Sequence, residues 1–584
     1  MAAVADYCIL FIHQLFFMST PDWIVLCGTL LLILAYGIYR SRRHDDLHGY
    51  LLGNKSLKWY QVGFSIMATQ ASAITFLSAP GQAYTDGMRF VQFYFGLPLA
   101  MIFLCIFFLP IFHKLKIFTA YEFLEQRFDL KTRTLTAMLF LTQRGLAAGL
   151  TIYAPSIVLS SLLGWNIYWT NIFMGGLVIT YTMLGGTRAV SITQLQQLMV
   201  IFAGMFLAAV MVVRLLPEGV GFIDALQVAG KMGKTNVITT NFSWNDRYNI
   251  WSGLIGGFFL SLSYFGTDQS QVGRYLSGKS IAQSRLGLLM NGILKIPMQF
   301  LILMIGALVF SFYQFHPAPV FFNTKQLDKV MQSEKSDAFR IVDQHYREIG
   351  EHKQQLATDL VAGIKSDDAL KIKAAQSSLQ SLDAESKVVR GEAIALIKEV
   401  DPAADTNDTN YIFLTFVLTY LPKGLIGLLI AMVFCASWNS TAAELNALAT
   451  TTVIDIYRRS INTTATQMQY VQVSKWATLG WGIFAICVAQ LANKLGSLIE
   501  AVNVLGSLFY GNILGIFLIA FFLKKVAGTP VFIAALITEL VVIMLYSQDA
   551  VAFLWLNLIG CITVMLLAWL LQKSGLFKSK IQPS

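Results

Sequence analysis

The sequence predicts an all-α polytopic membrane protein with about 13 transmembrane helices. Hydrophobic residues make up 55% of the 584-residue chain, whereas charged residues make up only 13%, and the mean hydropathy is +0.59. A soluble protein of this length needs about a quarter of its residues charged to cover its surface. The apolar residues also occur in long blocks, which is the pattern of helices that cross a bilayer.

Thirteen of these blocks are long enough to cross, because a hydrocarbon core of ~30 Å needs ~20 apolar residues. They lie near residues 22–40, 59–84, 90–113, 133–163, 166–184, 189–215, 249–275, 283–314, 412–455, 467–493, 498–523, 528–547 and 550–571. Several are longer than one crossing, so we expect kinks or interfacial turns in them. The apolar segment 8–18 is too short to span and is expected to lie on the membrane surface.

Basic residues predict the orientation. If the chain crosses the membrane 13 times, the clusters of Lys and Arg all lie on one side, and the positive-inside rule predicts that this side is cytoplasmic. These clusters are Arg40 to Lys58, His113 to Arg133, Arg274 to Arg285, Arg458 with Arg459, Lys524 with Lys525, and Lys573 to Lys580. We therefore expect a plasma-membrane protein, of the bacterial inner membrane, with segment 1–21 outside and tail 574–584 in the cytoplasm. The formal charge of +10 then reflects these loops and predicts no nucleic-acid partner.

One polar insertion, 316–410, separates membrane segments 22–315 and 411–573. Apolar residues recur within it at roughly helical spacing between charges, which predicts two or three amphipathic helices on the outer face, arranged as a hairpin. Leu370, Ile372, Leu379, Leu382, Val389 and Leu396 carry this pattern. A spacer and a module that binds an unknown partner both fit the pattern.

Two of the predicted spans contain small and polar residues at their middle, at 63–81 and 258–273. Backbone that leaves the helix cannot face lipid, so such stretches line a cavity enclosed by protein. They open the first and sixth spans of two consecutive blocks of five that run with opposite orientation. This is the 5+5 inverted-repeat plan of secondary transporters, with a binding site between the two broken helices.

The stretch "GRYLSGKS" (273–280) matches the phosphate-binding pattern GxxxxGK[ST]. That loop requires a buried strand before it and a helix N-terminus after it, whereas a membrane helix precedes Gly273. We predict no nucleotide partner and no enzymatic activity. The six cysteines form no CxxC pair, so no zinc site or disulfide framework is expected.

Transport without ATP requires an ion gradient. Sodium takes oxygen ligands, which an unwound helix supplies through its carbonyls and a facing helix through its side chains. Segment 437–441 offers Ser437, Asn439, Ser440 and Thr441 near the middle of a span. Charged residues within spans are also functional candidates, and those of this chain are Lys295, Glu500, Arg144, Glu444 and Glu539.

Several stretches resemble the sodium:solute symporter family, which has the LeuT-type fold. "GGTRAVSITQLQQ" (185–197), "SYFGTDQSQVGRYLSGKS" (263–280) and "SWNSTAAELNALATTTVIDIYRR" (437–459) are similar to family motifs. "FTAYEFLEQRFD" (118–129) and "GLTIYAPSIVL" (149–159) resemble the branch of iodide, monocarboxylate and multivitamin symporters. The resemblance covers almost the whole chain except 316–410.

The resemblance implies a sodium site formed by the carbonyls of Ala68, Ala71 and Ala436 and the side chains of Asn439 and Ser440. Position 439 departs from the family, which usually has a second hydroxyl there; an amide oxygen also ligates sodium. Gln194 replaces an Asp that contributes to a second sodium site in some members, which favours one sodium ion per cycle. We expect sodium to be the only coupling ion, and we expect no cofactor.

The resemblance also implies a solute site on the two broken helices and their neighbours. It would use Gln70, Ser72, Thr75, Ser261, Tyr264, Lys295 and Asn503. Tyr264 matches an aromatic residue that acts as an inner gate in sugar-transporting relatives; packing within the bundle is the other interpretation.

The expected function is therefore sodium-coupled symport of a small organic solute into the cell by alternating access. The branch resemblance favours a small organic anion such as a monocarboxylate, with Lys295 or Arg144 as its partner. A sugar or sialic acid is the first alternative, since the polar residues suit hydroxyl groups equally well. Proton-coupled symport, with a carboxylate such as Glu500 as carrier, and a sensor on a transporter scaffold are the others.

Overall fold

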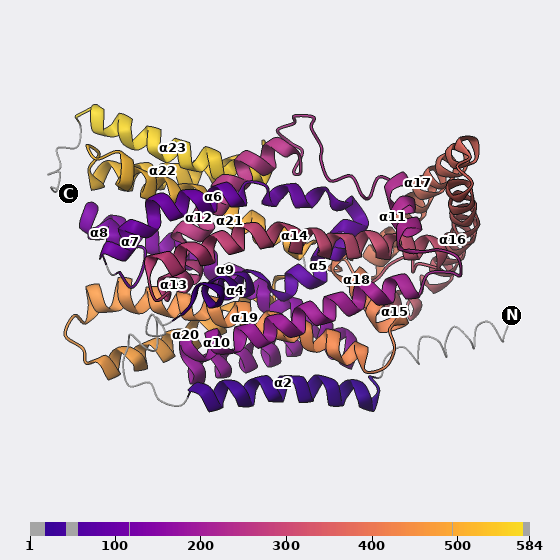
Figure 1. Ribbon diagram of the computed structural model, residues 1–584, viewed down its shortest axis with the longest axis horizontal. Helices are drawn as coiled ribbons and strands as arrows, with labels where there is room; N and C mark the ends of the chain where they lie inside the picture. The colour runs from indigo at the N-terminus through magenta and orange to yellow at the C-terminus, as the bar shows by residue number, and fades with distance from the viewer. Residues whose placement is uncertain (1–17, 42–56, 116, 493–494, 576–584) are drawn as a thin grey trace.

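The computed structural model describes residues 18–41, 57–115, 117–492 and 495–575. Over these ranges the chain is an elongated helical bundle (Figure 1), with one isolated bridge between Leu57 and Gly278 and no strand. Most of the predicted surface segment 8–18, the basic residues of 42–56 and the end of the tail lie outside the described residues.

The helices follow one another along the whole described chain. They are α2 (Thr20–Ser41), α4 (Trp59–Gln70), α5 (Ala73–Asp86), η2 (Met88–Tyr94), α6 (Leu97–Phe103), η3 (Leu104–Phe108), α7 (Leu109–Leu115), α8 (Glu122–Arg127), α9 (Leu130–Leu163), α10 (Ile167–Arg214), α11 (Phe222–Lys231), η4 (Ser252–Gly256), α12 (Gly257–Thr267), α13 (Gln269–Leu276), α14 (Ile281–Phe315), α15 (Thr324–Met331), α16 (Ser336–Lys365), α17 (Ala369–Val400), α18 (Thr409–Tyr420), α19 (Leu425–Thr451), η5 (Thr452–Ile461), α20 (Gln467–Ala489), α21 (Leu498–Phe522), α22 (Gly528–Ser547) and α23 (Phe553–Lys573).

Among the described residues, nine helical segments are long and apolar enough to cross a membrane, or ten with the bent pair α4–α5. The expected count of 13 is not reached by this criterion, because some expected spans are divided into short pieces. The span predicted at 249–275 consists of η4, α12 and α13, whereas that at 412–455 is still counted, through α19 with η5. The apolar part of α2, Thr20–Ile33, is also short.

α10 reverses direction within its length. The hydroxyls of Tyr181 and Thr193 lie 2.7 Å apart, although a straight helix would separate residues 12 positions apart by about 18 Å. The chain therefore crosses the bundle and returns, as the two spans predicted at 166–184 and 189–215 require.

Both expected broken helices are present. α4 and α5 meet at an angle of 62° across Ala71 and Ser72. α12 and α13 are separated by Asp268, whose backbone is extended and whose carboxylate accepts a hydrogen bond from the amide of Ser270. α13 packs against α4, so the two broken helices lie side by side.

The insertion forms a long antiparallel hairpin of α16 and α17 at one end of the bundle (Figure 1), which we call the hairpin end. α16 begins its amphipathic pattern at Phe339, which is buried against α17 residues Ala393 and Ile397. α16 also contacts α14 and α11, so the hairpin packs on the bundle.

Basic loops meet at the opposite end. Arg133 pairs with Glu125 at 2.7 Å and with Asp455 at 2.7 Å, and Arg459 also pairs with Glu125 at 2.5 Å. The Arg127 guanidinium donates to the carbonyl of Lys524 at 2.7 Å. Three segments that are distant in sequence are thereby joined at the end that the basic clusters predict to be cytoplasmic.

A close approach of helices fixes α5, the second half of the first broken helix. A Cβ added at Gly306 of α14 would lie 2.1 Å from the carbonyl oxygen of Pro80 in α5. We expect Gly306→Val to destabilise the protein by about 1–3 kcal/mol, the usual cost of overpacking, measured as loss of thermal stability in detergent. Gly176→Val in α10 is the matched control, because a Cβ there meets nothing within 4 Å. Equal melting temperatures of the two variants in detergent would contradict this close packing.

Candidate functional site

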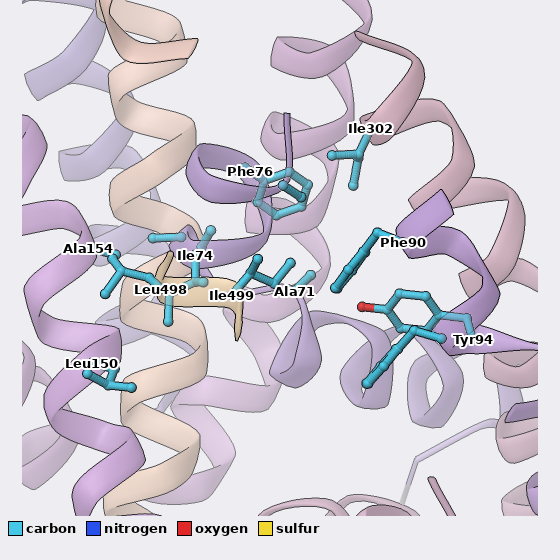
Figure 2. Packing of buried hydrophobic residues seen from close by; sticks show 14 of the residues in the cluster. Ala71, Ile74, Phe76, Phe90, Tyr94, Leu150, Ala154, Ile302, Leu498 and Ile499 are labelled. Atoms are coloured by element: carbon cyan, nitrogen blue, oxygen red, sulfur yellow. The ribbon is translucent and has the colours of Figure 1, made fainter. Parts of the chain in front are cut away.

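The two broken helices border a cavity of about 100 Å³ in the middle of the bundle, which we call the central cavity. η2, α9, α19 and α21 complete its wall. It is lined by Thr69, Gln70, Ser72, Ile74, Thr75, Phe93, Tyr94, Gln143, Arg144, Thr151, Leu260, Ser261, Tyr264, Phe265, Ser440, Glu444, Ile499, Val502, Asn503, Gly506 and Tyr510. Figure 2 shows Ile74 and Ile499 beside the α4–α5 break and Tyr94 across from them.

The break between α4 and α5 releases two carbonyls from the helical hydrogen-bond ladder. The amide of Ser72 would donate to Ala68 in an unbroken helix, but it donates to Gln70 at 3.1 Å. Likewise, the amide of Thr75 donates to Ser72 at 3.0 Å rather than to Ala71. The carbonyls of Ala68 and Ala71 are the ones that the resemblance assigns to sodium, and both residues are fully buried.

α19 packs against both halves of the broken helix and carries the other predicted sodium ligands. The Ser440 hydroxyl donates to the Ala436 carbonyl at 3.1 Å, so these two oxygens are adjacent. Asn439 is fully buried, and neither its amide oxygen nor its amide nitrogen has a hydrogen-bond partner among the described residues. A buried polar atom without a partner is costly, and a cation ligated by this oxygen would remove that cost.

Gln194 of α10 lies against α4. Its amide oxygen accepts a hydrogen bond from the Ser65 hydroxyl, and its amide nitrogen donates to the Thr69 hydroxyl at 3.2 Å. Both ends of the amide are therefore used by α4, in the place where the resemblance expects a carboxylate in members with two sodium sites.

Arg144 of α9 is the centre of a buried charge cluster. Its guanidinium pairs with Asp268 in the α12–α13 break and, at 3.1 Å, with Glu444 of α19. The Tyr510 hydroxyl donates to Asp268 at 2.8 Å, and the guanidinium also donates to this hydroxyl. One cation thus faces two carboxylates, and the ion pairs join three helices across the cavity.

Thr151 connects this cluster to the predicted sodium helix. Its hydroxyl donates to the second oxygen of Glu444 at 2.9 Å and accepts from the Thr441 hydroxyl at 3.0 Å. Its carbonyl accepts from the Ser437 hydroxyl at 3.2 Å. α9 is therefore bonded to three successive turns of α19 beside Ser440.

The structure brings together six of the seven predicted solute residues, all of which line the central cavity. Lys295 is the exception. It is fully buried in α14, its Nζ has no hydrogen-bond partner in the described chain, and it lies 5.5 Å from the centre of the Tyr94 ring. Since Tyr94 lines the cavity, Lys295 lies behind this ring rather than in the wall.

Tyr264, which the sequence analysis left as either a gate or a packing residue, lies in the cavity wall. Its ring lines the cavity and lies 5.3 Å from the Arg144 guanidinium, while its hydroxyl accepts a hydrogen bond from Gln271 at 2.6 Å. The ring is thus held at the side of the cavity next to α13.

Two charged residues of the predicted spans lie away from the central cavity. Glu500, the predicted proton carrier, is in the first turn of α21 at the hairpin end and pairs with Arg247 at 2.8 Å. Glu539 of α22 accepts from the Asn512 amide at 2.9 Å and does not line the central cavity.

Sequence reasoning missed Asp268, Tyr510 and Thr151 as parts of the site. Asp268 carried a usable signal, because it is the acidic residue inside a predicted broken helix. The other two did not, since a tyrosine and a threonine in apolar helices are common packing residues.

Comparisons with known proteins agree with this architecture. The family model described as "Sodium:solute symporter family" matches residues 50–335 and 389–538. The chain is 24% identical over 552 residues to the sodium/sialic acid symporter SiaT of Proteus mirabilis, covering 93% of each protein. It is 34% identical to human sodium-coupled monocarboxylate transporter 1 over 274 residues, 44% of that protein.

A solved structure, that of a substrate-bound, outward-open Na+-coupled sialic acid symporter, has the same fold with a TM-score of 0.73, 22% identity, and coverage of 95% of this chain and 98% of that one. The expected family is thereby confirmed by a match over most of the chain. This protein belongs to the sodium:solute symporter family and is a multi-pass membrane transporter, not an enzyme.

Proposed function

We propose that this protein uses one sodium ion per cycle to import a small polar solute through the central cavity. The unpartnered amide of Asn439, on the helix that packs against the released carbonyls of α4–α5, is the observation that carries the proposal. A sodium ion there would join the broken helix to α19. Its binding would therefore favour one arrangement of these two elements.

The charges around the cavity bear on the class of solute. Arg144 already faces Asp268 and Glu444, so a bound sodium ion brings this region to neutrality. A carboxylate solute would add a buried negative charge without a free cation, which is costly. Lys295 does not line the cavity. The prediction of a small organic anion stays untested, and this charge count favours its alternative, a neutral hydroxylated solute such as a sugar.

The polar wall suits such a solute. Gln70 and Asn503 offer amides, and Ser72, Thr75 and Ser261 offer hydroxyls. These groups both donate and accept hydrogen bonds, and Phe93, Tyr94 and Tyr264 add apolar faces. A ring with several hydroxyls matches this mixture of surfaces.

Transport then follows alternating access with the hairpin end outside. Sodium and solute favour the same state, and each raises the affinity of the other by the same factor. A membrane potential of 100 mV adds ~2.3 kcal/mol for the single charge carried inward, which drives accumulation even with one ion.

The sodium site is tested by uptake into proteoliposomes. The labelled panel contains glucose, galactose, sialic acid, lactate, pantothenate and iodide, each with an inward gradient of sodium or of potassium. We expect sodium-dependent accumulation of one solute. Loss of one ligand in Ser440→Ala should raise the sodium concentration for half-maximal uptake about tenfold or more, equivalent to ~1.4 kcal/mol.

Ser474→Ala is the matched control, since Ser474 of α20 is also fully buried but does not line the cavity. Uptake that is indifferent to sodium and to Ser440 contradicts the site and supports proton coupling in its place.

The solute class is tested with Glu444→Gln, which removes one negative charge and retains an acceptor for Thr151. We expect the ratio of lactate uptake to sugar uptake to rise, because the cluster then has one cation and one carboxylate. Glu539→Gln is the control, because Glu539 accepts a hydrogen bond from Asn512 outside the cavity. An unchanged ratio contradicts the role of cavity charge in selection.

The stoichiometry is tested at Gln194. Wild type should show a Hill coefficient for sodium near 1 and one charge moved per solute. Gln194→Asp places a carboxylate beside the Ser65 and Thr69 hydroxyls, so sodium cooperativity should rise toward two ions. Gln197→Asp, one turn along at a buried glutamine, should leave the coefficient at its wild-type value. A wild-type coefficient near 2 contradicts the single-ion proposal.

A further inference from the structure

A second cavity, of about 720 Å³, lies between the α16–α17 hairpin and the hairpin end of the bundle; we call it the chamber. The hairpin contributes residues of both of its helices, including Gly350 and Lys353 from α16 and Lys387 and Arg390 from α17. The bundle contributes the ends of α5, α14 and α21. The chamber is therefore built jointly by the transporter core and the insertion.

This part of the chain distinguishes the protein from the family pattern. The family match stops at residue 335 and resumes at 389, and the interval contains all of α16 and most of α17. The hairpin wall of the chamber is thus an addition to a fold that the rest of the chain shares with its relatives.

Aromatic rings form one wall of the chamber. Tyr84 lies edge-on to Phe310 at 5.5 Å and to Tyr313 at 6.0 Å between ring centres, and Tyr346 of the hairpin also lines the space. Such rings offer apolar faces with polar tips, surfaces that pack against the CH groups of a sugar or polyol.

Charged groups form most of the other walls, and most of them are paired. Asp383 binds Lys353 at 3.3 Å and Lys387 at 2.9 Å, and Arg247 binds Glu500 at 2.8 Å. Arg390 pairs with Asp408. Pairing fixes donors and acceptors in place while leaving little net charge, so the walls suit a neutral solute with many hydroxyls better than an ion.

Lys234 belongs to the same wall without a carboxylate partner in the described part of the chain. Its ammonium donates to the Thr85 carbonyl and lies 4.8 Å from the centre of the Phe310 ring. Burial lowers the pKa of Lys234 from its ordinary value. It therefore adds a donor beside the aromatic wall.

Two lining groups lack partners. The Gln314 amide oxygen and the Tyr313 hydroxyl have none among the described residues, although these side chains are only 3% and 5% exposed. Buried polar atoms of this kind require a water molecule or a ligand. Both belong to α14 and line the chamber, so hydroxyl groups bound there would complete their hydrogen bonds.

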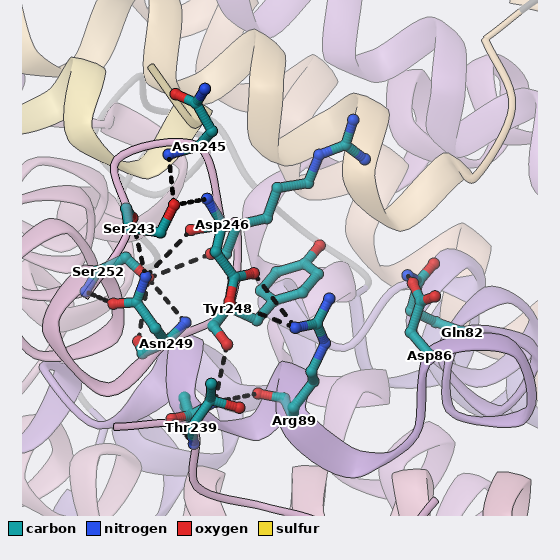
Figure 3. Close-up of polar contacts among 12 residues, drawn as sticks. Gln82, Asp86, Arg89, Thr239, Ser243, Asn245, Asp246, Tyr248, Asn249 and Ser252 are labelled. Atoms are coloured by element: carbon teal, nitrogen blue, oxygen red, sulfur yellow. Dashed lines mark hydrogen bonds and ion pairs between the residues drawn. The ribbon is translucent and has the colours of Figure 1, made fainter. Parts of the chain in front are cut away.

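The floor of the chamber separates it from the central cavity. The Ser497 hydroxyl donates to Gln82 at 2.9 Å, and the amide of Ile499 donates to the Ser78 hydroxyl at 3.3 Å. Ile499 also lines the central cavity, one residue before Glu500 of the chamber. Figure 3 shows Gln82 and Asp86 close together, beside the polar contacts of Arg89, Asp246 and Tyr248. A few hydrogen bonds thus lie between the two spaces.

We propose that the chamber is an external binding site for a neutral hydroxylated solute, which it holds above the closed floor before entry to the central cavity. The proposal rests on the proposed function for the identity of the solute, but its binding residues are separate. None of the predicted sodium ligands lines the chamber, so binding there should not require sodium.

The test measures equilibrium binding of labelled glucose, galactose, mannitol and lactate to the full-length protein in lipid nanodiscs. In potassium, we expect saturable binding of at least one hydroxylated probe at one site per chain. Sodium should add a second site, the central one. Asn503→Ala should weaken only the sodium-dependent site.

Gly350→Trp tests the space of the chamber. A Cβ at Gly350 meets nothing within 4 Å, and replacing a glycine within a helix favours the helix, so the ring should enter the chamber without unfolding α16. We expect sodium-independent binding to weaken about tenfold or more. Gly391→Trp is the matched control, since Gly391 of α17 is also open but does not line the chamber.

Gln314→Met tests the chemistry at nearly constant volume. It should weaken the same site, whereas Gln299→Met should not, because Gln299 is an equally buried glutamine of α14 away from both cavities.

Each remaining outcome has one meaning. The chamber site is overturned if no hydroxylated probe binds in the absence of sodium. It is also overturned if Gly350→Trp and Gly391→Trp weaken sodium-independent binding equally. Neither result contradicts sodium-driven uptake. Binding of lactate alone overturns the solute class. If wild type shows no sodium-dependent site but keeps binding that Gly350→Trp weakens, the proposed function fails and the chamber site stands.

Discussion

The structure depends on one constraint, that backbone polar groups inside a membrane need partners within the protein. The α4–α5 break leaves two carbonyls outside the helical ladder, and the surrounding helices must enclose them. α19 and α14 do so, and close contacts such as that between Gly306 and Pro80 hold the enclosing helix near the broken one. The oxygen atoms that make the break costly are the same ones that suit a sodium ion.

The buried Arg144 cluster applies a second constraint. Its ion pairs connect α9 to α19 and to the α12–α13 break, so any rearrangement of these elements must exchange partners within a medium of low dielectric. Removing a single charge from such a cluster is costly. The cluster therefore couples the second broken helix to the helix that carries the predicted sodium ligands, and its excess of carboxylates disfavours a further anion in the cavity.

The hairpin adds a layer to this arrangement. The central cavity and the chamber share α21, whose Ile499 and Asn503 face one space and whose Glu500 faces the other. Hydrogen bonds from Ser497 to Gln82 and from Ile499 to Ser78 close the floor between them. In the proposed route, a solute that passes inward must break these bonds, which would link opening of the floor to departure from the chamber through the first turns of α21 and the end of α5.

The sequence by itself determined the membrane class and the two broken helices, because hydropathy and small polar interruptions are local signals. It also selected six residues that the structure places in the wall of the central cavity. It also identified the family through motifs. Only the tertiary structure decided that Lys295 lies behind Tyr94, that Glu500 belongs to the chamber, and that Arg144 is shared by two carboxylates. These facts depend on which helix faces which, and residues as far apart as Arg144 and Glu444 carry no local sign that they will be ion-paired.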